Sequence, residues 1–330
     1  MAVAELEVTE TLVRKERSLL QESLIRLLRN KVAVVSGVFI FLLVLVAAFA
    51  NLIAPFSYAT QDLLANSAVP KWMLFLLPEG AEGYARITET FPLGADHLGR
   101  DLLSRTLYGA RVSLGFAFVA SMVSLVIGTI YGMISGYVGG RVDDIMMRIV
   151  DFLYAFPFLV VVILLQTYFK ALERRGGGGF IFDLNAQMGG MFFLFIAIGL
   201  IDWIGMARIA RGQVLQYKRM EFVEAAHAVG ASGTRVLSRH LLPNVLGPLI
   251  VAESLNIPGY IFTEAFLSFI GLGVNAPTPS WGIMISEAVQ GLRSYPNQVL
   301  VPAIALSLTT LAFNFLGDGL RDALDPRLKQ

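Results

Sequence analysis

Long apolar stretches alternate with polar segments along this chain, a pattern typical of a helical membrane protein. About 20 apolar residues in a helix cover roughly 30 Å, the thickness of the hydrocarbon core of a bilayer. The first stretch, Val32 to Ile53, carries no charged residue. Five more follow, at Val112 to Tyr131, Ile149 to Phe169, Met188 to Ile204, Val245 to Ile270 and Val299 to Leu316. We therefore expect an all-α polytopic membrane protein with six transmembrane helices.

Composition supports the same class. The 330 residues are 55% hydrophobic and 15% charged, whereas soluble domains carry about 25% charged residues. The net charge of +1 gives no sign of a nucleic-acid partner. The absence of cysteine excludes disulfides, thiol catalysis and cysteine-ligated metal.

The distribution of basic residues predicts the orientation, because Lys and Arg are retained on the cytoplasmic side. With the N-terminus inside, 17 of the 26 basic residues fall in cytoplasmic segments and 9 in external ones. We expect both termini to be cytoplasmic, and membrane lipid to surround the spans. The divisions are a cytoplasmic amphipathic segment (1–31), the first transmembrane helix (32–53), an extracytoplasmic loop (54–111), a transmembrane core (112–316) and a cytoplasmic tail (317–330).

The cytoplasmic loop between the fourth and fifth spans, residues 205–244, predicts a short helix. Met220 to Val229 contains no helix breaker, starts with Glu221 and Glu224, and ends before Gly230. Acidic residues favour a helix start and glycine a helix end. We expect Ser232 and Pro243 to bracket a second short helix that returns the chain to the membrane.

The first of these helices carries small residues, Ala225, Ala226 and Ala228, which allow its backbone to approach another protein closely. An ordinary amphipathic connector would also be rich in alanine, because alanine is the best helix former. The residues alone favour neither alternative.

Sequence motifs resemble one family of transporters. Glu224-Ala225-Ala226, followed by Gly230 and by 240–243 (His-Leu-Leu-Pro), resembles the EAA loop of ATP-binding-cassette importer permeases. His240 replaces an aliphatic residue of the general pattern, as in the peptide and nickel branch. Residues 91–111 and 263–282 resemble the C-type permease of dipeptide and oligopeptide importers.

The resemblance implies a type I importer permease fold with a cytoplasmic coupling helix, in a bacterial or archaeal cell membrane. It implies partners: a homologous second permease, two ATP-binding subunits that hold ATP and Mg, and an extracytoplasmic substrate-binding protein. No lysine follows a glycine, so this chain lacks a phosphate-binding loop, and we expect neither catalysis nor a cofactor in it. The residues implied in coupling to an ATPase are Glu221, Glu224, Ala225, Ala226, Gly230 and Pro243.

Ionisable residues within spans are candidates for function, because charge at membrane depth is costly. Glu253 and Glu264 are spaced for one face of the fifth span, where they would line the pathway and meet the amino group of a peptide. Alternatively, Glu264 would lie near the outer interface and Glu253 would pair with a neighbouring helix. Asp202 is expected to mark an interfacial helix end. The three histidines lack ligand spacing, so no metal site is expected.

Two other classes compete with an ATP-driven importer. An ion-gradient-driven secondary transporter would need broken helices in two related halves, and no second copy of the fifth span is evident. A membrane-embedded hydrolase would need a nucleophile and base, and no such grouping is evident. The substrate stays open among dipeptides, oligopeptides, glutathione, nickel chelates and oligosaccharides.

Overall fold

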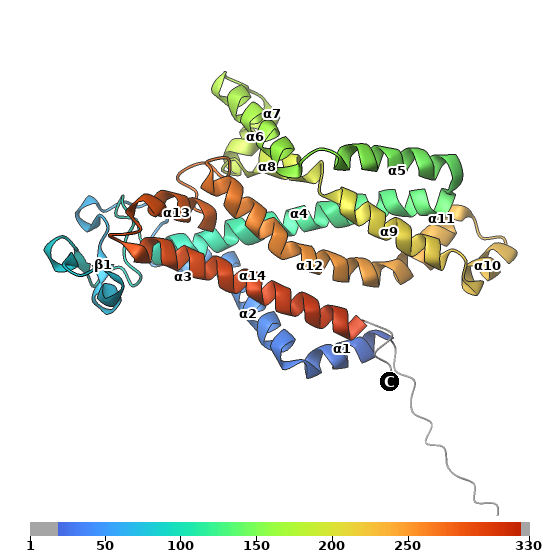
Figure 1. Cartoon of the computed structure of the whole chain (residues 1–330), viewed down its shortest axis with the longest axis horizontal. Coiled ribbons are helices and arrows are strands. Elements are labelled where there is room, and N and C mark those ends of the chain that lie inside the picture. Colours follow the sequence, from blue (N-terminus) through green and yellow to red (C-terminus); the bar gives the residue numbers. More distant parts are fainter. Residues whose placement is uncertain (1–18, 325–330) are drawn as a thin grey trace, which may run out of the picture.

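The computed structural model describes residues 19–324, an elongated helical bundle with a small lobe at one end (Figure 1). Residues 1–18 of the predicted amphipathic segment and 325–330 of the tail lie outside the described part. The helices are α1 (Leu19–Arg29), α2 (Lys31–Ala48), α3 (Ala50–Ile53), α4 (Leu102–Val138), α5 (Gly140–Tyr154), α6 (Phe158–Arg174), α7 (Phe180–Gln187), α8 (Met191–Gly199), α9 (Trp203–Tyr217), α10 (Glu221–Ala228), α11 (Gly233–Arg235), α12 (Leu242–Phe269), α13 (Trp281–Ala288) and α14 (Pro296–Leu324).

Five helical segments are long and apolar enough to cross a membrane, and a sixth is added if the bent pair α5 and α6 forms one span. The six apolar stretches of the sequence are therefore found, with changed bounds. The second span is longer than expected, because α4 begins at Leu102 within the predicted loop. Asp101 caps this start by accepting a hydrogen bond from the backbone N–H of Ser104 (2.8 Å).

The third span is not the continuous helix expected from Ile149 to Phe169. Between α5 and α6 the chain bends by 76° at residues 155–157. Pro157 lies at the bend and stands just before α6. Proline has no N–H for a helical bond and disfavours helical geometry in the residue before it, which explains the interruption.

The fourth and fifth spans both extend into the predicted loop 205–244. Residues 191–217 form one apolar helical segment with a junction at 200–202, and 233–269 form another. The expected second short helix is therefore the start of the fifth span. Pro243 does not end a helix there: it lies in the first turn of α12, after the π-helical turn η4 (Val236–Leu241).

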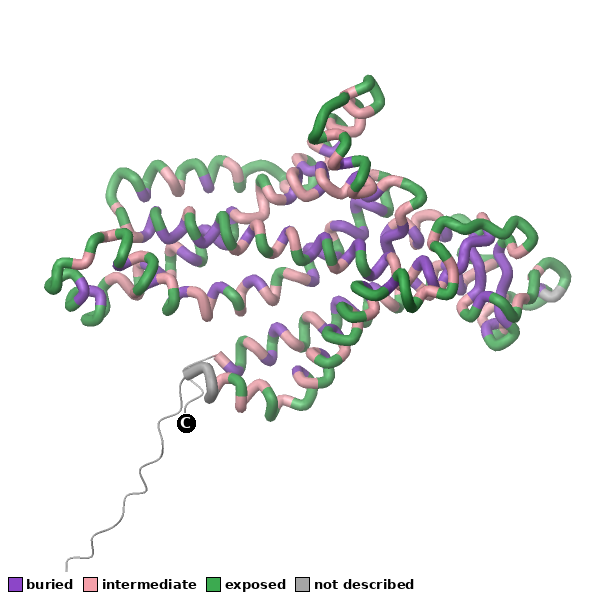
Figure 2. Tube along the Cα trace, turned by 180° about the vertical axis from the view of Figure 1, so that it is seen from behind, coloured by how far each residue is buried: buried purple, intermediate pink, exposed green. Residues whose placement is uncertain are grey.

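Helix α4 packs closely against α9. Gly128, Gly132 and Gly136 form a stripe at four-residue spacing, and a Cβ on any of them would lie within about 3 Å of α9 atoms. Small residues at this spacing allow helix backbones to approach closely. The buried positions run along the facing sides of the long helices in Figure 2, so the core lies between these spans.

Residues 54–101 form the lobe at one end of the bundle (Figure 1). Its elements are η1 (Leu63–Ala65), β1 (Val69–Pro70), η2 (Lys71–Leu76), η3 (Ala81–Gly83) and β2 (Ile87–Thr88). Outside the lobe, a further 3-10 segment, η5 (Val289–Gly291), follows α13. Strands β1 and β2 pair in parallel, with Val69 opposite Ile87. The longest helical segment of the lobe is the 3-10 helix η2, with six residues. A small core of Ala68, Phe91 and Ala95 holds the lobe together.

Candidate functional site

The helix predicted between the fourth and fifth spans is present. Helix α10 covers Glu221–Ala228 after an extended residue, Met220, and carries Glu221 and Glu224 in its first turn. Gly230 follows with φ +83°, a left-handed conformation that glycine adopts without a steric cost. Figure 1 places α10 at the end of the bundle farthest from the lobe.

One face of α10 is anchored in the protein. Val223 and Ala226 are buried and join an apolar cluster with Val236 and Leu241 of η4 and Val214 of α9. The small residues predicted to form one contact face therefore lie on two different faces of α10. Ala226, 5% exposed, points into the protein, whereas Ala225 and Ala228 are exposed.

Contacts with the end of α4 fix α10 further. The ring of His227 stacks on Tyr137 with centroids 6.5 Å apart. Lys218 Nζ, just before α10, donates a hydrogen bond to the carbonyl oxygen of Gly136 (2.7 Å). A displacement of α10 would therefore be passed to α4 as well as to α9 and η4.

The opposite face of α10 is exposed in the described part of the chain. Glu221, Glu224 and Ala225 are exposed, and Val229, directly after the helix, is 85% exposed. A β-carbon on Gly230 would meet nothing within 4 Å. Pro243 is also exposed. Five of the six predicted coupling residues thus lie on accessible surface, and Ala226 is the exception.

Glu264 lies at the contact between α12 and α4. Its side chain is fully buried and accepts hydrogen bonds from Ser113 (2.8 Å) and Ser268 (2.6 Å). Ser113 belongs to α4, so the carboxyl group links two spans. Glu264 is therefore enclosed between two helices, which is neither the accessible position expected of a pathway residue nor the interfacial position of the alternative.

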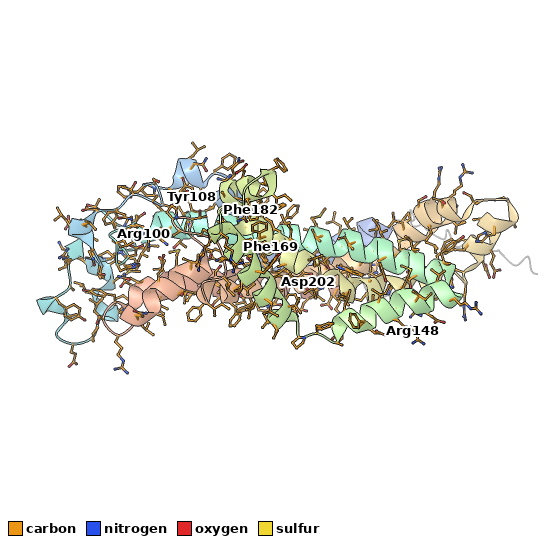
Figure 3. All side chains as sticks on the ribbon, turned by 90° about the horizontal axis from the view of Figure 1, so that it is seen from above. Arg100, Tyr108, Arg148, Phe169, Phe182 and Asp202 are labelled. Atoms are coloured by element: carbon orange, nitrogen blue, oxygen red, sulfur yellow. The ribbon has the colours of Figure 1, made fainter. Side chains whose placement is uncertain are left out.

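Glu253 is 3% exposed and accepts hydrogen bonds from Tyr260 (2.8 Å) and Ser124 (3.3 Å). Ser124 is also within 3.4 Å of the backbone oxygen of Asp202. Asp202 does not mark the end of a span, since it lies near the middle of the 27-residue segment 191–217. Figure 3 shows it midway along the bundle.

Two ion pairs between α5 and α9 were missed by the sequence reasoning. Arg211 forms a bidentate pair with Asp143 through Nε and Nη2, both at 2.6 Å, and Ser135 donates a short hydrogen bond to the same carboxylate. Arg208 pairs with Asp151 at 2.7 Å. The sequence did carry a signal for these pairs. Asp143 and Asp151 lie eight residues apart on one helix, and Arg208 and Arg211 lie on a later helix.

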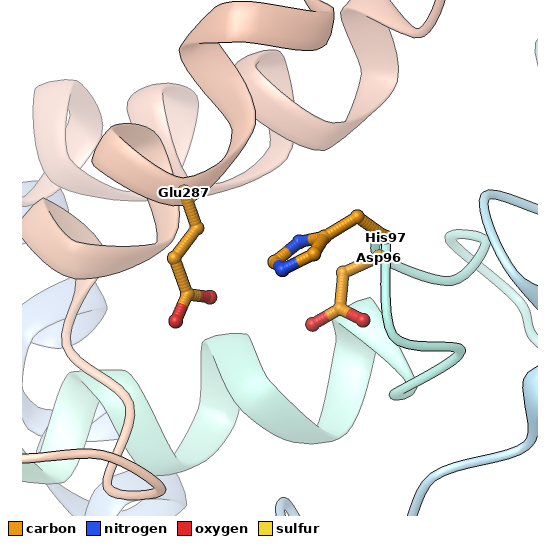
Figure 4. A group of neighbouring side chains, drawn as sticks. All are labelled: Asp96, His97 and Glu287. Carbon is orange, nitrogen blue, oxygen red and sulfur yellow. The ribbon is translucent and has the colours of Figure 1, made fainter.

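Asp96, His97 and Glu287 come together near the lobe, with ligand atoms within 4.8 Å of one another (Figure 4). Both carboxylates are already paired with guanidinium groups. Arg100 donates to Asp96 (2.6 Å) and to Glu287 (2.7 Å), and Arg105 donates to Glu287 (2.9 Å). The two guanidinium groups neutralise the two carboxylates, so the cluster forms a partly buried ionic link between the lobe and α13.

Farther out on the lobe, Lys71 and Glu89 form an exposed ion pair at 2.7 Å. The hydrogen bond from Lys71, together with its charge, lowers the pKa of the Glu89 carboxyl group. The pair is fully solvated and contributes little to stability.

An apolar helical bundle of this kind, with an anchored helix exposed between two spans, defines a multi-pass helical membrane protein. Residues 128–330 match the family described as "Binding-protein-dependent transport system inner membrane component". Residues 18–76 match the "N-terminal TM domain of oligopeptide transport permease C". The chain belongs to the family of binding-protein-dependent transport system inner membrane components.

Curated relatives cover nearly the whole chain. An oligopeptide transport system permease protein of Bacillus subtilis is 40% identical over 97% of this chain and 94% of its own length. That of Haemophilus influenzae is 42% identical over 94% of this chain and 89% of its own length. A dipeptide transport system permease protein of Bacillus subtilis is 40% identical, over 97% and 90% respectively.

Among solved structures, a chain of the MetNI methionine ABC transporter aligns with a TM-score of 0.49 and 16% identity, over 68% of this chain and 96% of that chain. The family match and the sequence relatives confirm the predicted permease family, and the helices of the structure confirm the all-α fold class. They do not favour the ion-gradient-driven alternative.

Proposed function

We propose that this chain forms half of the translocation pathway of an ATP-driven importer of di- or oligopeptides. The relatives named above are oligopeptide and dipeptide permeases that match over almost their whole length, which supports this substrate class. The other half of the pathway comes from a homologous permease. A substrate-binding protein delivers peptide on the outer side, and two ATP-binding subunits hold ATP and Mg.

Helix α10 is the part held by an ATP-binding subunit, and its geometry is the observation that carries the proposal. One face is fixed by Val223 and Ala226, while Glu221, Glu224 and Ala225 remain accessible. Because α10 is packed against the protein on one side and exposed on the other, a displacement of its exposed face also moves the segments that contact its buried face. Closure of the ATPase pair then moves the spans between two states of access.

The orientation follows the basic residues and agrees with the position of α10. In Figure 1 the end of α14 and helix α10 lie away from the lobe. With α10 facing the cytoplasm, the C-terminal end of α14 is cytoplasmic and the lobe faces outward, where it meets the binding protein. The N-terminus is cytoplasmic by the same count of charges.

Uptake by vesicles tests this function directly. The assembled transporter takes up peptide only with internal ATP and loaded binding protein, and a proton or sodium gradient without ATP gives no uptake. Gradient-driven uptake by this chain alone would instead establish a secondary transporter.

A further inference from the structure

A cavity of about 590 Å³ lies at the bend of the third span. Its walls come from the bend itself (Tyr154, Phe156 and Phe158), from the junction between α8 and α9 (Asp202) and from α12. Interruptions in two helices therefore meet at one cavity. Broken helices at membrane depth are tolerated where they line a cavity or are covered by protein.

One face of α12 supplies polar groups to this cavity. Asn256, Tyr260 and Thr263 line it at spacings of four and three residues, which places them on one side of the helix. The Tyr260 hydroxyl donates to Glu253 behind it, so its oxygen is oriented by a buried carboxyl group. The remaining wall is apolar and aromatic.

Asp202 is the acidic residue of the lining, and its charge is not balanced there. Its Oδ2 atom is buried and has no hydrogen-bond partner among the described residues. No Lys, Arg or His of the described chain lines the cavity. Arg208, the nearest basic residue in sequence, is paired with Asp151 and lies over the ring of Tyr154 in the cavity wall, 4.3 Å from its centroid. Asp202 as a whole is half-buried, so its carboxylate is partly accessible while Oδ2 lacks a partner among the described residues. A carboxylate in this setting is costly to keep charged, and a cation in the cavity would reduce that cost.

We propose that this cavity binds the protonated amino group of a passing peptide, with the Asp202 carboxylate as its acceptor and Asn256 and Tyr260 beside it. The inference rests on the function proposed above and moves the amine contact expected of Glu253 to Asp202, since both Glu253 oxygens already accept hydrogen bonds. The rings of Phe156 and Phe158 offer further attraction to an ammonium group, whereas the ring of Tyr154 already carries Arg208.

Binding of trialanine and of N-acetyl-trialanine to the assembled transporter in nanodiscs, without binding protein, tests the proposal by calorimetry. Asp202→Asn should weaken trialanine binding by about tenfold to a hundredfold, the loss of one charge-assisted hydrogen bond, and leave the acetylated peptide unchanged. Asp183→Asn is the matched control, because Asp183 is an exposed carboxylate in the first turn of α7, outside the cavity.

A cavity-filling variant keeps the test decisive if Asp202→Asn fails to assemble. A Cβ on Gly259 would meet no atom within 4 Å, so the leucine of Gly259→Leu can enter the cavity and should abolish trialanine binding. Equal trialanine affinity in wild type, Asp202→Asn and Gly259→Leu would overturn the proposal. Asp202-dependent binding of potassium, with trialanine binding unchanged in the variants, would also overturn it and would assign the site to an inorganic cation.

ATP- and binding-protein-dependent uptake is measured on the same wild-type preparation. If that uptake is absent, the proposed function fails. If it is present and the variants bind trialanine normally, only the cavity assignment fails.

Discussion

The glycine stripe of α4 predicts opposite effects for the same substitution at two positions of one helix. At Gly132 a Cβ would clash with the backbone oxygen of Ala207 and lie 2.8 Å from the Cβ of Ala210. Since backbone cannot move aside cheaply, Gly132→Ala must separate α4 from α9, at a cost of about 1–3 kcal/mol for overpacking. At Gly115 nothing lies within 4 Å. There alanine stabilises the helix by up to about 1 kcal/mol.

The difference between the two variants is therefore about 1–4 kcal/mol, with opposite signs relative to wild type. Thermal unfolding of the detergent-solubilised protein, followed by intrinsic fluorescence, measures it. Gly115→Ala should match or exceed the wild-type midpoint, and Gly132→Ala should fall below it. A Gly132→Ala protein as stable as Gly115→Ala would refute the close packing of α4 on α9.

Three further outcomes are expected. Gly230→Asn should retain peptide uptake and Gly230→Val should lose most of it, because asparagine tolerates the left-handed backbone and a β-branched residue does not. Glu264→Ala should lower the free energy of unfolding by about 1–3 kcal/mol, seen as a lower unfolding midpoint, because it leaves Ser113 and Ser268 without their buried partner. Glu264→Gln should lower it less. Zinc should raise the midpoint of wild type no more than that of His97→Ala, because arginines occupy the neighbouring carboxylates; a zinc effect that requires His97 would indicate a metal site.

Hydropathy predicted how many apolar segments the chain has better than where they begin and end. The hydropathy pattern ends the fourth span at Ile204, because the charges of Arg208 and Arg211 are typical of a loop. In the structure their charges are paired with Asp151 and Asp143 of α5, so the helix continues past them. A pairing between distant segments has no signature in a local average of hydropathy.

The bend in the third span escaped prediction for a related reason. Pro157 lies within a continuous apolar run, where hydropathy shows no interruption, and only its backbone chemistry signals the break. The spacing of Gly128, Gly132 and Gly136 was also readable from the sequence as a close-packing stripe.

The candidate site, too, could be predicted from the sequence only in part. Local signals, acidic residues at the start and glycine at the end, located α10 almost to the residue. Which of its alanines faces outward could not be predicted, because that depends on the contact of Val223 and Ala226 with η4 and α9.

The central claim is that the exposed face of α10 receives force from an ATP-binding subunit, and Ala225→Trp tests it most directly. Peptide uptake by the purified, reconstituted complex is measured beside the thermal midpoint of the permease and the activity of the isolated ATP-binding subunits. Because Ala225 is exposed, the tryptophan should abolish uptake while leaving the midpoint and the isolated ATPase activity unchanged. Normal ATP-driven uptake by an assembled Ala225→Trp complex would contradict the account.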